Sequence, residues 1–127
     1  MRIFLNLFLV LIFVLGKAQN VPESAKIQEF KNCKTIDCKI AKSFLLAEYF
    51  LETDDIQSSQ KWLNLTKNLV SPKQSDTTIV FIHSLQSELF YYDGLFQFGN
   101  NEAEKAIQKA RQLRNNLLIA NGYFFKG

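Results

Sequence analysis

The chain has 127 residues, of which 47% are hydrophobic and 21% are charged, and its formal net charge is +3. This length suits one small domain, and the apolar content excludes a disordered chain. Glycine and proline are scarce, at 5 and 2 residues. Since few residues break helices and no polar–apolar alternation is evident, the sequence predicts an all-α domain.

The N-terminus has the pattern of a secretory signal peptide. Arg2 supplies the positive charge, residues 3–15 are apolar except for Asn6, and small residues at 16 and 18 suit cleavage after Ala18. We therefore expect residues 1–18 to be removed and the mature protein to be periplasmic or secreted. The alternative is an uncleaved signal that tethers the protein to the membrane, although the apolar run is shorter than the roughly 20 residues of a spanning helix.

Removal of the signal peptide also changes the charge balance. It takes away Arg2 and Lys17 and no acidic residue, so the formal charge falls from +3 to +1. A chain this close to neutral offers no electrostatic attraction for nucleic acid, and we expect no such partner.

The next elements are predicted to be three helices. Residues 19–36 are expected to form a linker and a short helix from about 22 to 32, followed by a turn at 34–37 in which Thr35 or Asp37 caps the second helix. That helix runs from about 38 to 53 because its apolar residues recur at helical steps. Asp54-Asp55 ends it and caps a third helix over about 56–70, which ends before Pro72.

Three further helices are expected after the polar segment 71–76. The fourth runs from about 76 to 98, because an apolar helical period continues past the β-branched residues at its start. Gly99-Asn100-Asn101 is interpreted as its stop. The fifth helix then runs from about 102 to 113 or 114, and the sixth begins near 116.

Two triplets with the same spacing indicate repeated helix packing. Each reads small, large, small at steps of 4 and 3, where small side chains let helices approach and the large one fills the gap. The triplets are Ser59, Leu63, Thr66 and Ala103, Ile107, Ala110.

With its preceding helix, the first triplet resembles the tetratricopeptide repeat (TPR), a helix–turn–helix unit of about 34 residues. Leu46, Ala47 and Phe50 match the first helix of that family, and Ala47 precedes Ser59 by the family's 12 residues. Residues 119, 120 and 123 repeat the first-helix pattern, which predicts Ala120 as a further close-packed position. The resemblance implies a TPR-like α-solenoid over residues 37–127, with about two and a half repeats.

The second repeat departs from the family pattern. Its triplet lies 44 residues after the first, and Tyr91 rather than a small residue stands 12 residues before Ala103. We expect the first helix of this repeat to be shifted, with Ser87 as its close-packed position. In the third repeat no second helix follows to cover Leu117, Tyr123 and Phe124, so we expect the chain to be part of a longer protein with further repeats.

This resemblance implies a non-catalytic module that binds a protein or peptide. An exported TPR region is similar to the sensory N-terminal part of bacterial two-component histidine kinases, and a membrane helix would then lie downstream. The alternative is a free-standing exported helical protein of unknown role. If the resemblance holds, the binding surface is the concave face lined by first helices, with these candidates in the first repeat: Phe44, Glu48, Leu51 and Glu52.

Few residues offer catalytic or metal chemistry, so we expect no enzyme, cofactor or metal. His83 is the one histidine and is expected on a helix surface. Glu48 and Glu52 lie one turn apart and could share acid–base work, but a solvated helix face is the favoured interpretation. Cys33 and Cys38 can pair across the turn at 34–37, whereas on a continuous helix they would point apart. The alternative is two separate thiols, one of them buried.

Overall fold

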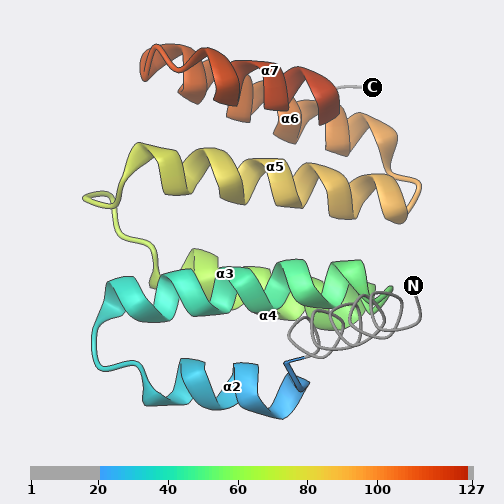
Figure 1. Cartoon of the computed structure of the whole chain (residues 1–127). Coiled ribbons are helices and arrows are strands. Elements are labelled where there is room, and N and C mark those ends of the chain that lie inside the picture. Colours follow the sequence, from blue (N-terminus) through green and yellow to red (C-terminus); the bar gives the residue numbers. More distant parts are fainter. Residues whose placement is uncertain (1–20, 126–127) are drawn as a thin grey trace, which may run out of the picture.

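The computed structural model describes residues 21–125, which form six helices and no strand. The helices lie in a stack with α2 at one end and α7 at the other (Figure 1). The expected signal peptide lies outside the described residues. Within residues 21–125, none of the helices is both long enough and apolar enough to span a membrane. In chain order the helices are α2 (Glu23–Asn32), α3 (Ile36–Glu52), α4 (Ile56–Leu69), α5 (Asp76–Tyr92), α6 (Phe96–Gln112) and α7 (Asn116–Phe125).

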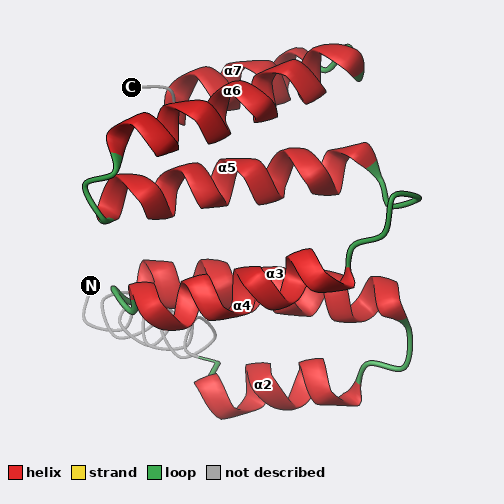
Figure 2. Cartoon of the chain, turned by 180° about the vertical axis from the view of Figure 1, so that it is seen from behind, coloured by secondary structure: helices red, strands yellow, loops and turns green. Residues whose placement is uncertain are grey.

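Three tight turns connect α3 to α4, α5 to α6 and α6 to α7. Each contains one residue with positive φ: Asp54 at 60°, Gly94 at 72° and Arg114 at 53°. The amide after each of these donates a hydrogen bond to a carbonyl five residues earlier, the pattern of a Schellman turn. These short turns make α3–α4 and α5–α6 into antiparallel pairs, whereas a longer loop joins α4 to α5 (Figure 2).

Both pairs are joined close to their connecting turn by a buried hydrogen bond between residues 12 apart. In the first pair the Ser59 hydroxyl donates to the Ala47 carbonyl at 2.6 Å. In the second pair the Ser87 hydroxyl donates to the Gly99 carbonyl at 2.7 Å. The two bonds occupy corresponding places, because Ala47 and Ser87 are 40 residues apart, as are Ser59 and Gly99. The architecture is therefore all-α and repeat-like, with a shift of 40 residues between the pairs.

The predicted boundary between the fourth and fifth helices was wrong. The break lies at 93–95, and residues 99–101 lie within α6 rather than between two helices. Gly99 is buried, and a Cβ atom there would lie 3.1 Å from the Ser87 carbonyl oxygen and from the Tyr91 ring. Asn100 accepts a hydrogen bond from the Tyr91 hydroxyl. Gly99 therefore serves close helix packing and does not end a helix.

This boundary error also changes the correspondence between the two triplets. The structure pairs Ser59 with Gly99, so the second triplet is displaced by one helical turn from the packing position predicted for it. All six triplet residues are nevertheless fully buried. Ser87 has the close-packed position that we expected.

The prediction for Ala120 was wrong, because this side chain is exposed. The buried small residue of α7 is Gly122, where a Cβ atom would lie 2.5 Å from a side-chain carbon of Ile107. The pattern at 119–123 matches the first-helix motif, but the helix turns a different face toward α6.

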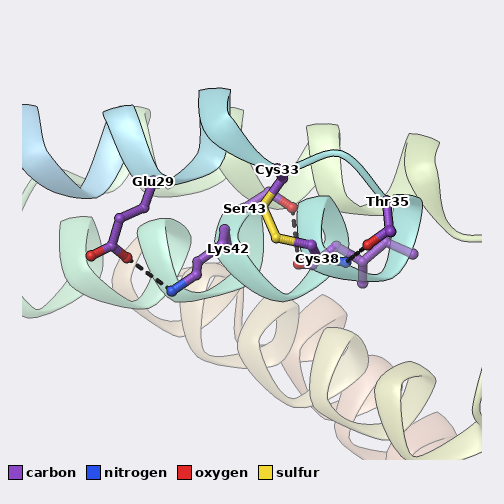
Figure 3. Close-up of a disulfide and its surroundings, with 7 residues drawn as sticks. Glu29, Cys33, Thr35, Cys38, Lys42 and Ser43 are labelled. Carbon is purple, nitrogen blue, oxygen red and sulfur yellow. Dashed lines mark hydrogen bonds and ion pairs between the residues drawn. A yellow bond between two sulfur atoms is a disulfide. The ribbon is translucent and has the colours of Figure 1, made fainter.

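Helix α2 is attached to the first pair by contacts of several kinds. Cys33 and Cys38 form a disulfide across the break between α2 and α3, with Cα atoms 5.5 Å apart (Figure 3). Thr35 caps α3 by accepting a hydrogen bond from the Cys38 amide. The Glu29 carboxylate pairs with Lys42 on α3, and the Phe30 ring contacts Trp62 on α4. The disulfide thus closes a short loop and holds α2 on α3.

Candidate functional site

A groove runs along the line where α3 and α5 face each other. Its wider part is a cavity of about 490 Å³ with mainly apolar walls. The rings of Phe44 on α3 and Phe81 on α5 lie 6.2 Å apart and form the middle of these walls. At its far end, the Gln74 side chain donates a hydrogen bond to the Asp37 carboxylate and links the α4–α5 loop to α3. We call this part the apolar end; its lining includes Ile40, Ala41, Phe44, Leu45, Thr78 and Phe81.

The groove continues toward the C-termini of the same two helices, where its walls become acidic. Glu48 and Glu52 on α3 face Glu88 on α5 across a cavity of about 160 Å³. Leu51 and Leu85 lie at its base, and Tyr92 stands at its rim. We call this part the acidic end. An intermediate hollow shares Phe44 and Phe81 with the apolar end and Glu88 with the acidic end, so the groove is continuous.

The carboxylates of the acidic end are electrostatically strained. Burial raises the pKa of Glu48, and repulsion from Glu52 and Glu88 raises it further. Burial, followed by repulsion from Glu52, likewise raises the pKa of Glu88. Within residues 21–125, the acidic side chains that form ion pairs with lysine or histidine lie outside the acidic end. The acidic end is therefore a place where negative charge gathers without a cationic side chain to balance it.

The four candidates from the sequence lie along this groove, but they differ in exposure. Phe44 and Glu48 are half-buried in its walls, and Glu52 is exposed at the acidic end. Leu51 is only 6% exposed and packs with Leu63 and Leu89 in the core. Leu51 is thus mainly a core residue that presents one edge to the groove.

Helix α5 contributes groove residues that the sequence pattern did not predict. Phe81, Leu85 and Glu88 form the opposite wall of the groove. A signal for Glu88 exists, because it follows Glu48 by the same 40 residues that relate the two serine bonds. The expected separation of 44 residues obscured this correspondence.

A second cluster of charged side chains lies between α5 and α6. The His83 ring nitrogen Nδ1 is 2.6 Å from the Glu102 carboxylate, which also pairs with Lys105 at 2.6 Å. His83 is half-buried, whereas we expected it on the helix surface. Burial acts to raise the pKa of Glu102, but the hydrogen bonds and charges of Lys105 and His83 outweigh it, and the pKa is lowered. This cluster is internally balanced and joins two helices.

Metal coordination is not supported in the part of the chain that the structure describes. There, no three histidine, cysteine, aspartate or glutamate side chains come together in a group that could hold an ion. Both cysteines are taken up by the disulfide. The groove itself combines an apolar wall with an acidic one.

No family model, curated protein or solved structure matches this chain.

Proposed function

We propose that this protein is a non-catalytic, TPR-like interaction module that works outside the cytoplasm and binds a segment of another protein in the α3–α5 groove. The groove is the observation that carries the proposal. Its walls come from the first helices of two successive helix pairs, with Asn121 of α7 beside the middle hollow, and its apolar end has a volume of about 490 Å³. A cavity of this size accommodates one or two large side chains, and such sites are commonly apolar with a few polar groups.

An elongated ligand fits this groove better than a compact one. The cavities at the apolar end, the middle and the acidic end share wall residues in sequence along α3 and α5. A peptide segment can place successive side chains in them, whereas a small molecule would occupy only one. Stacked helix pairs commonly present extended binding surfaces of this kind.

The place of the module in a signalling protein is a further part of the proposal. The signal-peptide pattern and the TPR resemblance support an exported sensory region, such as that of a two-component histidine kinase. The coding sequence beyond residue 127 tests this part: a membrane helix followed by a kinase domain supports it, and a stop codon favours the free-standing alternative.

Selection of peptides on the purified chain tests the binding function. A random peptide library is selected on the protein, and the affinity of the enriched peptides is measured by fluorescence anisotropy. We expect Ala41→Trp to weaken their binding strongly, because Ala41 is exposed in the wall of the apolar end and an indole there would fill the cavity.

The matched control is Gln108→Trp, which adds the same indole at an exposed position on α6 outside the groove. It should leave binding unchanged. If no peptide is enriched, or if both tryptophan variants bind like the parent chain, the groove is not a peptide-binding site.

A further inference from the structure

The two ends of the α3–α5 groove have different walls, so each end favours a different kind of side chain in a bound partner. The apolar end exposes aromatic and aliphatic surface, with Phe81 41% and Leu45 53% exposed. Covering such surface favours a large apolar side chain, because apolar area leaves water. The acidic end offers three carboxylates instead. An occupant that spans both ends must therefore be amphipathic.

Charge complementarity decides what the acidic end accepts. The carboxylates of Glu48 and Glu88 are half-buried and repel each other and Glu52, and neither belongs to the ion pairs formed within residues 21–125. A cation from outside would remove this repulsion. An acidic segment would add to it, so the groove selects against such partners.

The acidic end suits a side-chain cation better than a metal ion. No group of three possible ligands in the described range gathers closely enough to hold a metal. A lysine ammonium or an arginine guanidinium reaches separated carboxylates through a long flexible stem. Tyr92 at the rim is 57% exposed, and its ring face can also attract such a cation.

The helix geometry sets the spacing between the two ligand groups. Glu48 and Glu52 follow Phe44 by one and two turns of α3, which places them about 6 and 12 Å along the helix axis. In an extended peptide, side chains on one face recur about every 7 Å. A cation two or four residues from an apolar side chain therefore lies on the same face and reaches the acidic end.

We propose that the partner segment is an extended peptide with one large apolar side chain and a lysine or arginine two or four residues away, on the same face. The apolar side chain packs against Phe44 and Phe81 in the apolar end, and the cation lies among Glu48, Glu52 and Glu88. This inference rests on the proposed peptide-binding function and names the chemistry of the partner.

Designed peptides test this chemistry on the full chain. The probes are fluorescein-labelled eight-residue peptides of glycine and serine that carry phenylalanine and, four residues later on the same face of an extended chain, lysine, glutamine or glutamate. Anisotropy titrations should give a Kd about tenfold lower for the lysine peptide than for the glutamate peptide. Added salt should reduce this preference, since the acidic end is partly open to solvent.

Charge-neutral variants connect the preference to the groove. Glu48→Gln with Glu88→Gln should bring the lysine and glutamate peptides to within about twofold of each other. Glu23→Gln with Asp93→Asn removes two exposed carboxylates that do not line the groove and should retain the tenfold preference. Thermal melts by circular dichroism establish that all variants are folded.

The outcomes separate the inference from the proposed function. Equal affinity for lysine and glutamate peptides, with binding still lost in Ala41→Trp, overturns the partner chemistry and leaves the peptide-binding groove intact. A lysine peptide whose phenylalanine is replaced by serine should bind more weakly than the parent lysine peptide. If the two bind equally, the groove recognises the cation alone, and the proposed partner chemistry is also overturned. Absence of binding by every peptide at millimolar concentration overturns both proposals.

Discussion

The two helix pairs α3–α4 and α5–α6 share one plan, but their interiors are filled by side chains of different size. Both turn at a positive-φ residue and both are joined by a serine–carbonyl bond between residues 12 apart. In the second helix of each pair, the 40-residue shift matches three positions: Ser59 with Gly99, Leu63 with Ala103, and Thr66 with Ala106. At each of these positions the second pair has the smaller residue. All six residues are buried.

This difference shows that the same fold can be packed in two ways. Leu63 fills the space between helices in the first pair, whereas the second pair brings the backbones together at Gly99, where a Cβ atom would lie 3.1 Å from the Ser87 carbonyl oxygen. Close packing is satisfied in both cases, by side-chain volume in one and by backbone approach in the other.

Exchanging the large and small side chains at the matched positions 63 and 103 should give the largest changes in the free energy of unfolding. We expect Leu63→Ala to lower the free energy of unfolding by about 3 kcal/mol because it leaves a cavity. Ala103→Leu should lower it by about 2 kcal/mol because it overfills a site with no space. Urea unfolding followed by circular dichroism measures both, and Ile36→Ala at an exposed site serves as the control. An unchanged stability of Ala103→Leu would mean that the pairs are not packed differently.

Removing the two serine hydroxyls tests what the pairs share. Ser59→Ala and Ser87→Ala should each lower the free energy of unfolding by about 1 kcal/mol, since each removes one buried hydrogen bond to a carbonyl. Similar losses are expected because the two bonds lie at corresponding places in the two pairs. The donating serine is on the second helix, α4, in the first pair and on the first helix, α5, in the second pair. The same urea titrations apply, with Ser71→Ala in the exposed loop as the reference. A loss in only one of the two variants would contradict the equivalence.

The smallest effect concerns corresponding residues on the groove face of the two pairs, Glu48 and Glu88. Their pKa values in the folded chain are raised above the ordinary 4.5, because the fold favours the protonated carboxyl. This contribution to stability is therefore fully present below pH 4.5 and is lost as the pH rises through the raised pKa values. Glu48→Gln with Glu88→Gln should therefore stabilise the fold at pH 7 by a few tenths of a kcal/mol, a small value because both groups are partly solvated.

This gain should disappear at pH 4, where the carboxylates are protonated in the parent chain. Denaturant titrations at the two pH values measure it. Glu102→Gln provides the opposite case, because the pKa of Glu102 is lowered and its loss should destabilise the fold at pH 7. A double glutamine variant that is less stable than the parent at pH 7 would show that the acidic end is not strained.

The sequence by itself determined the helical class and most helix positions. Periodic apolar residues predicted α3 and α4 to within about two residues, and the capping residues Thr35 and Asp55 act where polar side chains were expected to cap. These features depend on local interactions, so they can be read from neighbouring residues. The disulfide was one of two alternatives, and the turn between α2 and α3 permits it.

Only the tertiary structure decided how the helices face each other. Gly99 was interpreted as a helix stop, because glycine is a poor helix former and two asparagines follow it. The weaker Asp93-Gly94 signal marks the real turn. Close contact with Ser87 and Tyr91 explains a glycine inside α6, and no local pattern contains that contact. The same holds for Glu88, which joins Glu48 and Glu52 in the groove only because α5 packs beside α3. Local sequence sets where a helix forms, whereas its register against a neighbour depends on residues far away in the chain.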